Sequence, residues 1–549
     1  MSGPTKPWTR LRRIWIGPVL GLACVTAAAL LAVFLSDWLR RPEALRAKGP
    51  LELLFLYDEE TLQNTLGNLA STVVAVLGIV ITVVAIVVQL AATRYTPRVT
   101  ELFFRERTNL FVLGFFVVTC ILAVWVSLAV GAGFVPRASV ITAVLGVTAS
   151  LLLIVPYFAY VFDFLDPERI VERIQENALG AIAGLEPSGV ERAQEQLHRA
   201  IEQLADIAVA ATGQQDRIIS AKAVDALRVL AVQYTRVKPG LPRSWFELGP
   251  VLAASPDFQA MNAGAVAALI QDGLWLEWVV LRKYQTIYNG ALSDDPDMNY
   301  LVAIDTRYLG EAILTGGTRP ALALVVKFMN TYLRATLNRR QVRTAYNLLN
   351  QYRQLAEAAV VAEQPELVTE IAGYLRYYAQ VSHGLELGFV TETIAYDLAA
   401  LCELAHGSRS RAHDPLLGAL LEVDKEAESE AQESTLRGVR KAQVRLAAYY
   451  LSRDDAATAR RIFMDMEQER PERLASIRDE ILRITSPDFW EVIDRGANFD
   501  YMDEAKKAHL KVFFSWFEKV PPVDTAQLQR PSRDHPSAPT LERVSGTRP

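Results

Sequence analysis

The sequence has few of the residues on which catalysis and cross-linking in proteins most often depend. Its 549 residues include three cysteines and six histidines, and so few cysteines cannot cross-link a chain of this length. It contains no glycine-rich phosphate loop, no nucleophile elbow and no pair of histidines at the spacing of a metal site on a helix. We therefore expect no enzymatic activity, no cofactor and no bound metal.

Cys402, His406 and His413 are the nearest approach to a metal-binding group. A zinc site built from them needs a fourth ligand, so we interpret the two histidines as solvated side chains at a helix end. Cys24 and Cys120 lie inside apolar runs, where a thiol behaves as a small apolar side chain. None of these residues predicts chemistry.

Charge is scarce as well, but only in the first part of the chain. Residues 1–163 contain 13 Lys and Arg and 9 Asp and Glu, whereas residues 164–549 contain 44 and 53. The second part has the charge content of an ordinary soluble domain, and its net charge of −9 argues against a nucleic-acid partner. This division predicts a transmembrane domain over 1–163 and a cytoplasmic domain over 164–520. A disordered, proline-rich tail is expected over 521–549.

Four long apolar runs without Asp, Glu, Lys, Arg or His explain the low charge of the first part. A helix of about 20 residues crosses the hydrocarbon layer of a bilayer, and each run has at least 21 residues. Backbone groups in lipid must be satisfied internally, so the runs predict a four-helix transmembrane bundle. The absence of ionisable side chains argues against a proton-coupled pump. The predicted spans are Ile14–Leu35, Leu69–Ala92, Leu110–Val130 and Ala138–Phe162.

The basic residues between the runs predict the orientation of the chain. Four arginines lie within the 17 residues of loop 93–109, and one lies in loop 131–137. By the positive-inside rule, the N- and C-termini are cytoplasmic and loop 36–68 lies outside. Arg94 and Arg98, at the end of the second span, are predicted to contact anionic lipid headgroups, worth about 1 kcal/mol each. The alternative is that they only fix the topology.

The end of the second span resembles a known family. Val88–Arg98 reads Val-Gln-Leu-Ala-Ala-Thr-Arg-Tyr-Thr-Pro-Arg. With Thr65–Val74 before it, this is similar to a bacterial family of predicted multi-span membrane proteins of unknown function, whose second span exits through Gln-Leu…Tyr-Ser/Thr-Pro-Arg. Asn109–Phe116 resembles the start of the family's third span. The resemblance covers about residues 10–170. It implies a multi-pass protein of the bacterial inner membrane and supplies no chemistry.

From Leu165 onward the pattern is helical, and alternating strands are scarce. Asp166, Pro167 and Glu168 read as an N-cap, a proline at the first helical position and an acid at the positive end of a helix. Apolar residues recur with the 3.6-residue period in most of the following segments, which predicts an all-α domain. Residues 237–257 are rich in Pro and Gly. They are predicted to form a long loop, at which the domain has an alternative division.

Residues 440–473 resemble one tetratricopeptide unit. Tyr450 falls on the aromatic position of its first helix, and Ala459 on the small residue where the two helices touch. Phe463 and Pro471 fall on the late aromatic position and the terminal proline. One such unit is not an array, so the sequence predicts an irregular domain of tetratricopeptide-like helical hairpins.

Surfaces of stacked helical hairpins commonly bind proteins, so we expect a protein partner in the cytoplasm. Tyr374, Tyr378 and Tyr450 are the candidate partner contacts. Because Tyr374 and Tyr378 are four residues apart and share one helix face, core packing is the alternative.

The densest polar stretch, Phe489–Tyr501, has two interpretations. Its acidic residues Glu491, Asp494 and Asp500 are able to hold a cation or a basic peptide. Alternatively, Asp494 and Arg495 organise a turn while the aromatic residues of the stretch seal the core. We favour the turn.

Two functions remain open at this stage. The leading hypothesis is a membrane-tethered scaffold or adaptor, because spans without charge anchor a domain that resembles an interaction module. The alternative is a homo-oligomeric channel or gated pore, in which several copies of the second span line the pore and the cytoplasmic domain senses a signal. The small residues Gly67, Ser71 and Ala75 lie on one face at the start of that span. Such a stripe also suits helix packing within a single bundle.

Overall fold

The computed structural model divides the chain into two compact units, residues 1–174 and 175–549. In the residues that it describes the chain is all-α, as predicted, and no β-strand occurs. Most of the predicted tail and most of the stretch 488–497 lie outside these residues. The described residues are 17–39, 59–94, 103–104, 106–130, 136–183, 189–423, 430–487 and 498–521, with single residues at 185, 495 and 523.

Among the described residues, the first unit holds four apolar helices. Its helices are α2 (Gly17–Leu39), α4 (Glu59–Arg94), α6 (Arg107–Ala129) and α7 (Arg137–Phe164). Within α4, α6 and α7, the stretches 60–91, 107–129 and 137–164 are long and apolar enough to cross a membrane, and they coincide with the second, third and fourth predicted spans. The first predicted span falls on α2. Its apolar part among the described residues, Ala23–Ala32, is shorter than a span, so this span stays a prediction.

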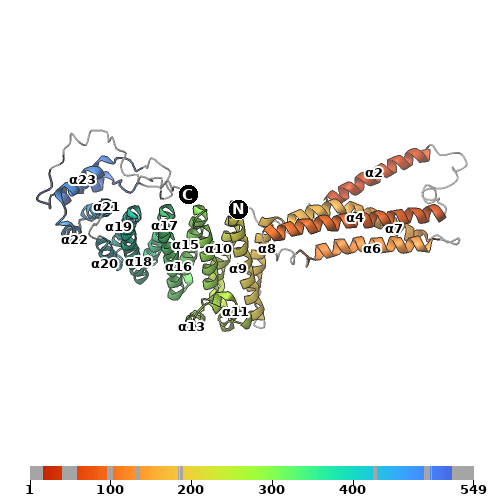
Figure 1. Cartoon of the computed structure of the whole chain (residues 1–549), viewed down its shortest axis with the longest axis horizontal. Helices are drawn as coiled ribbons and strands as arrows, with labels where there is room; N and C mark the ends of the chain where they lie inside the picture. Colours follow the sequence, from red (N-terminus) through yellow and green to blue (C-terminus); the bar gives the residue numbers. More distant parts are fainter. Residues whose placement is uncertain are drawn as a thin grey trace, which may run out of the picture. The chain divides into compact units, whose positions relative to one another are not determined.

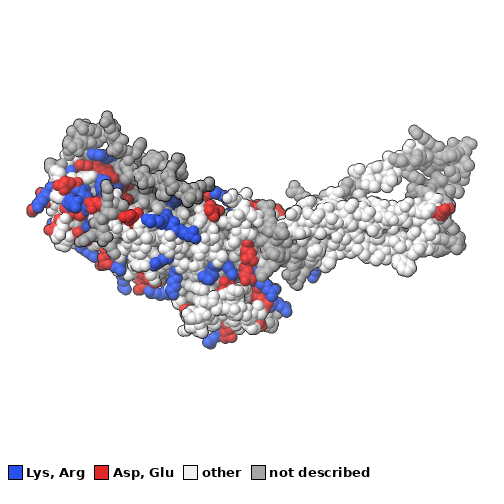
Figure 2. Space-filling model, in the orientation of Figure 1, with Lys and Arg blue, Asp and Glu red and all other residues white. Residues whose placement is uncertain are grey.

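Helices α4, α6 and α7 pack against one another, and α2 contacts α7. The approach of α6 to α7 is close at Gly146, where a Cβ atom would lie 3.2 Å from Cγ2 of Thr119. A buried hydrogen bond joins the same two helices, since the Tyr157 hydroxyl donates to Oδ1 of Asn109 over 2.5 Å. The outward faces are aliphatic, and Figure 2 shows almost no charged side chain on the described surface of these helices.

The second unit is a two-layered stack of helices. Each helix contacts the next helix of its own layer, and the first four pairs of helices also contact each other across the layers. The helices follow one another in chain order (Figure 1). The first layer contains α9 (Val190–Gly213), α14 (Trp275–Ala291), α16 (Arg319–Asn338), α18 (Pro365–Gly384) and α20 (His413–Leu421). The second layer contains α10 (Arg217–Val237), α15 (Pro296–Gly316), α17 (Val342–Val361), α19 (Gly388–Gly407) and α21 (Glu430–Ser452).

Three shorter helices complete the stack beyond α21, which contacts each of them. They are α22 (Ala456–Met466), α23 (Pro471–Arg483) and α24 (Glu504–Phe514). In the stretch that resembles a tetratricopeptide unit, Ala459 is fully buried on α22 and Pro471 is the first residue of α23. Before the stack, α8 (Pro167–Ala183) contains the boundary between the two units.

The turns between the central helices repeat one motif. Arg340, Glu363, Glu386 and Arg409 follow one another every 23 residues, and each has a positive φ of 54–56°. The backbone amide of the residue that follows each of these four donates a hydrogen bond to the carbonyl five residues earlier, as from Gln364 to Ala359 over 3.0 Å. This is the Schellman ending of a helix, which usually carries glycine at the left-handed position. Four helices of equal length, α16 to α19, are thereby joined by equal turns.

The predicted loop 237–257 is folded into short helices. They are η4 (Lys238–Gly240), η5 (Arg243–Phe246), α11 (Pro250–Ala253) and α12 (Pro256–Gln259), followed by α13 (Ala263–Gln271). Gln194 of α9 donates to the carbonyls of Trp245 and Glu247 over 2.9 and 2.7 Å. The indole of Trp275 on α14 donates to the Trp245 carbonyl as well. The segment thus belongs to the core of the second unit, because Trp245 is fully buried.

Candidate functional site

A row of polar side chains crosses the second layer. Arg228 Nε lies 3.5 Å from Asp305 Oδ1, and Arg307 Nε donates to Gln351 Oε1 over 2.7 Å. These side chains are largely buried, so they contact one another inside the helical stack and are not surrounded by solvent. We call them the polar row. Its members are Arg228 on α10, Asp305 and Arg307 on α15, Gln351 and Arg353 on α17, and Asp397 on α19.

One end of the polar row is covered by the chain itself. Arg495 donates two hydrogen bonds to the carboxylate of Asp397 and a third, over 2.9 Å, to the carbonyl of Tyr346. Both partners of the ion pair are buried, with side-chain exposures of 3% and 2%. Arg353 Nε lies 3.3 Å from the same carboxylate. Two guanidinium groups therefore neutralise one buried carboxylate.

Phe499 and Asp500 extend this contact onto α19 and α21. The ring of Phe499 is stacked on that of Tyr396, and the Tyr396 hydroxyl donates to Asp500 Oδ1 over 2.5 Å. Lys441 of α21 donates to Asp500 Oδ2 over 3.1 Å. The surface formed by α17, α19 and α21 thus accepts three kinds of group: a guanidinium, an aromatic ring and a carboxylate. We call Arg495 and residues 498–501 the covering segment.

Lys441 is the electrostatic centre of the contact on α21. Its ammonium group lies 3.1 Å from both Glu480 and Asp500 and 3.6 Å from Glu392. Burial alone lowers the pKa of Lys441, but the three surrounding carboxylates raise it above its ordinary value. Lys441 is therefore charged at neutral pH and holds these carboxylates together.

The structure describes only part of the stretch Phe489–Tyr501. Asp500 binds Lys441, and Phe499 packs onto Tyr396, as the aromatic part of the favoured interpretation expects. Glu491 and Asp494 lie outside the described residues, so neither the turn nor the cation site is tested.

The three tyrosines predicted as partner contacts occupy different environments. The Tyr378 hydroxyl donates to the Asn330 carbonyl over 2.9 Å, and that of Tyr450 lies 2.7 Å from His413 Nε2. Both rings are buried. Tyr374 is half-buried and its hydroxyl bonds Glu370 on the same helix. Of the three, only Tyr374 presents part of its ring at the surface.

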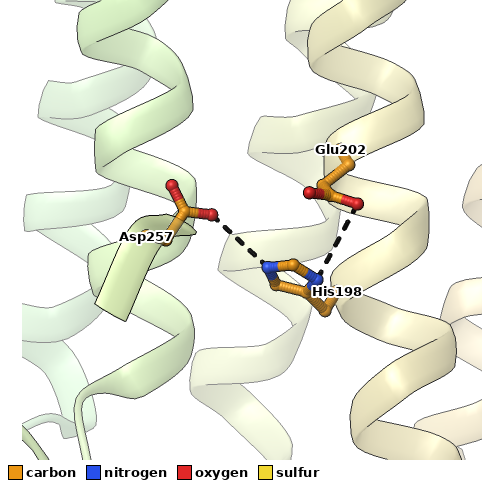
Figure 3. A group of neighbouring side chains, drawn as sticks. All are labelled: His198, Glu202 and Asp257. Carbon is orange, nitrogen blue, oxygen red and sulfur yellow. Dashed lines mark hydrogen bonds and ion pairs between the residues drawn. The ribbon is translucent and has the colours of Figure 1, made fainter. Parts of the chain in front are cut away.

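His198, Glu202 and Asp257 come together at α9 and α12 (Figure 3). Nε2 of His198 lies 3.4 Å from Asp257, and Nδ1 lies 3.9 Å from Glu202. Each ring nitrogen thus faces a different carboxylate, whereas a metal would use only one of them. Lys283 already lies 2.9 Å from Asp257. Burial acts to raise the Asp257 pKa, but the bonds from His198 and Lys283 lower it below its usual value. The geometry is that of an ion-pair network.

The predicted cluster of Cys402, His406 and His413 is also assembled. The two imidazole rings lie 5.2 Å apart between centroids, and His406 Nε2 lies 3.3 Å from Asp455. Cys402 is fully buried, and burial raises the pKa of its thiol above the ordinary value. The histidines are bonded within the fold rather than solvated, which differs from the interpretation given above.

A cavity of about 610 Å³ lies where α10, η4, η5, α14 and α15 meet. Glu277 of α14 is 1% exposed and its Oε1 accepts a hydrogen bond from Lys238 over 2.5 Å. Its other oxygen, Oε2, is buried without a hydrogen-bond partner among the described residues. Burial raises the pKa of Glu277, and Lys238 opposes that rise.

In the membrane unit the predicted lipid contacts remain open. Arg94 is the last residue of α4, but its side chain and all of Arg98 lie outside the described residues.

Candidate spans followed by a stack of helices define an all-α membrane protein. Residues 12–273 match the model of a family described as "Predicted membrane protein (DUF2254)". The match confirms the resemblance to a family of predicted membrane proteins of unknown function. It also extends beyond the predicted limit near residue 170 and ends after α13.

One similar solved structure is described as "Circular tandem repeat protein with novel repeat topology and enhanced subunit contact surfaces". It is 14% identical, covers 83% of this chain and 94% of its own, and has a TM-score of 0.23. At that score the similarity carries no argument about this chain. No curated protein matches the sequence.

Several site residues were not predicted from the sequence. His198 and Glu202 are four residues apart on a predicted helix. This spacing places both side chains on one helix face, so their contact was predictable from the sequence. Glu277 and Asp397 each lie in an otherwise apolar part of a helix, which marks a buried charge that needs a partner.

Proposed function

We propose that the protein is a membrane-tethered scaffold that binds a protein partner on the second layer of its helical unit. In this proposal the chain is a multi-pass protein of the bacterial inner membrane, with both termini in the cytoplasm. The stacked hairpins act as a tetratricopeptide-like interaction domain, and no reaction or cofactor is assigned. Lipids are the other partners, through Arg94 and Arg98.

The covering segment is the observation that carries this proposal. It is a stretch of chain without helix or strand, and it lies across α17, α19 and α21 through a buried arginine, an aromatic ring and a carboxylate. Helical stacks bind partner segments through the same combination of stacked rings and charge-assisted hydrogen bonds. This surface therefore has the chemistry needed to hold a segment of a partner.

The polar row continues beyond the covering segment, onto α15 and α10. There Tyr308 is 41% exposed, with the guanidinium of Arg307 4.3 Å from the centre of its ring. Arg228 lies 5.5 Å from the same ring. An exposed tyrosine between arginines is the residue combination found at the energetic centres of protein interfaces. We propose this part of the row as the partner contact.

Photo-cross-linking from position 308 of the full-length protein in native membranes tests the proposal. A cross-linking residue at Tyr308 is expected to capture one partner protein, at a discrete site within the partner. A matched cross-linker at Met464, an exposed residue of α22, is expected not to capture that protein. Equal capture from both positions, or no capture from position 308, would refute the proposed contact.

The homo-oligomeric pore is the alternative function. The described outward side chains of α4 are mostly aliphatic, and the hydroxyls of Thr72 and Thr82 bond carbonyls of their own helix. Such a surface suits contact with lipid, which supports the tether over the pore. The mass of the protein in detergent distinguishes the two, because a pore lined by one span of each chain needs several copies.

A further inference from the structure

The covering segment contacts the second layer through groups that a peptide of another protein is equally able to offer. Arg495, Phe499 and Asp500 bring a guanidinium, a ring and a carboxylate to α17, α19 and α21. Arg445 of α21 also donates to the backbone carbonyl of Phe499. None of these contacts depends on how the segment is joined to the rest of the chain, so a separate peptide with the same side chains in the same order would make them as well.

This surface discriminates among side chains at three points. The carboxylate of Asp397 accepts two hydrogen bonds from the guanidinium, whose carbon lies 4.4 Å from the centre of the Tyr346 ring. A lysine cannot reproduce that planar, two-point contact. The ring of Tyr396 is stacked on that of Phe499, with 4.9 Å between centroids. The Tyr396 hydroxyl and the ammonium of Lys441 face the carboxylate that follows. The surface therefore fits an arginine, an aromatic residue four positions later and an acid directly after it.

The buried charge beneath the segment decides what is able to replace it. Asp397 is 2% exposed, and a buried charge that loses its partner is strongly destabilising. Departure of the segment into solvent is therefore unfavourable. Exchange for a peptide with the same three groups leaves every charge paired, and Arg353, 3.3 Å from Asp397, stays beside the carboxylate throughout. The surface thus opens only to a segment that carries the matching groups.

The helices on both sides of the segment have contacts of their own with the stack. Both α23 and α24 contact α21. Asp503, which follows the segment, caps α24 by accepting from the amide of Lys506 over 2.9 Å. The ammonium of Lys506 in turn pairs with Glu403 of α19 over 2.9 Å. Exchange of the segment between them therefore leaves the anchoring of both helices intact.

We propose that the covering segment is an internal ligand that a partner protein displaces, and that the partner presents an arginine, an aromatic residue four positions later and an acid directly after it. This inference rests on the proposed function, in which the second layer receives a partner. It adds the regulation of that surface. The segment closes the part formed by α17, α19 and α21 until a matching partner is present, whereas the part at Tyr308 stays open for the first contact.

Binding of a synthetic peptide to the full-length protein in lipid nanodiscs tests the inference by fluorescence anisotropy. The probe has the sequence of residues 495–501, Arg-Gly-Ala-Asn-Phe-Asp-Tyr, and the control peptide has alanine in place of its arginine and phenylalanine. The receptor is the variant Arg495→Ala/Phe499→Ala, whose own segment lacks both anchoring side chains. The probe is expected to bind saturably to this variant, and the control peptide is not. Wild type is expected to bind the probe at least about tenfold more weakly, because its tethered segment competes at an effective concentration of about 1 mM.

Three results would overturn the inference. They are no saturable binding of the probe to the double variant, equal binding of the probe and the control peptide, and equal binding of the probe to the double variant and to wild type. None of these measurements involves Tyr308. Failure of the proposed partner contact is therefore detected separately, by the cross-linking experiment at that position.

If the double variant does not fold, as judged by its melting profile, the wild-type protein decides the inference. A probe with photoreactive benzoylphenylalanine in place of its phenylalanine is added at millimolar concentration, and the labelled residues are mapped by mass spectrometry. Labelling of α19 around Tyr396 is expected, and an excess of unlabelled probe is expected to suppress it. Labelling that the excess does not suppress, or labelling away from α19 and the helices beside it, would contradict the inference.

A second copy of this chain carries the same sequence as the probe, so the source of the displacing segment needs a test of its own. Two wild-type copies with different tags are produced together, solubilised and purified through one tag. Recovery of the other tag is expected to be the same for wild type and for Phe499→Ala. Loss of the other tag on Phe499→Ala would mean that the segment lies on a neighbouring copy, and would overturn the assignment to a partner protein.

Discussion

Arg495 and Asp397 form a buried, two-point ion pair although 98 residues separate them in the sequence. The pair fastens the covering segment to α19, and Arg353 of α17 contacts the same carboxylate. Removal of one partner from a buried ion pair leaves the other charge without compensation, which costs more than the pair itself contributes. The stability of this part of the stack therefore depends on Asp397 more than on any exposed acid nearby.

Asp397→Asn is expected to lower the free energy of unfolding by about 3–5 kcal/mol, because it leaves two guanidinium groups facing a neutral amide. Asp414→Asn is the matched control. Asp414 pairs with Arg461 over 2.6 Å at the surface, where an ion pair contributes about 0–1 kcal/mol. Chemical denaturation of the full-length protein in one detergent compares the two variants. Equal losses would contradict the buried role of Asp397.

The packing of the covering segment was predictable from the sequence only in part. The aromatic residues of Phe489–Tyr501 were expected to seal the core, and Phe499 does pack on Tyr396. The surface beneath Arg495 and Phe499 was not predictable, because α17 and α19 are brought beside residue 495 only by the stacking of the layers. The local periodicity of a sequence indicates which face of a helix is apolar. It does not indicate which charged residue from a distant part of the chain contacts that helix.

Three of the four candidate membrane spans and the helical class were predictable, because both depend on local composition. The equal turns that recur every 23 residues were not predictable. Glycine is the usual sign of a left-handed helix end, but here those positions hold Arg340, Glu363, Glu386 and Arg409. The segment 237–257 was predicted to be a loop from its Pro and Gly, whereas Gln194 and Trp275 hold it as short helices in the core.

A pH dependence is expected from Asp305. Burial raises the pKa of Asp305 to about 8, against the lowering effect of Arg228. The folded state keeps this proton up to about pH 8, whereas the unfolded chain loses it near the ordinary value of 3.8. Its contribution to stability is therefore fully present below about pH 4 and is lost as the pH rises to about 8. The slope is at most about 1.4 kcal/mol per pH unit.

Asp305→Asn removes this titration. Between pH 5 and pH 8, the wild-type protein is expected to lose more stability than Asp305→Asn, by up to about 4 kcal/mol. Denaturation midpoints of both proteins at the two pH values measure the difference. Parallel pH profiles would show that Asp305 is already ionised in the folded protein at pH 5.

The left-handed turns make a prediction at Glu363, an exposed residue with φ of 54°. A β-branched side chain is strongly disfavoured in this conformation, by about 1–2 kcal/mol. Glu363→Val is therefore expected to lower the melting temperature, while Glu363→Gly changes it little because glycine adopts this conformation freely. Glu366→Val, at an exposed position in the first turn of α18, controls for the loss of a surface acid. Similar melting temperatures for Glu363→Val and Glu363→Gly would contradict the turn geometry.

In the membrane unit, the contact between Gly146 and Thr119 limits the size of the side chain that α7 is able to carry. A Cβ atom at Gly146 would lie 3.2 Å from Thr119 Cγ2, whereas one at Gly78 on α4 meets no other atom within 4 Å. Gly146→Val is expected to force α6 and α7 apart at a cost of about 1–3 kcal/mol, and Gly78→Val to have little effect. Thermal denaturation in detergent compares the two, and Thr119→Ala combined with Gly146→Val is expected to recover part of the loss. If Thr119→Ala brings no recovery, the two residues are not in contact and α6 and α7 pack elsewhere.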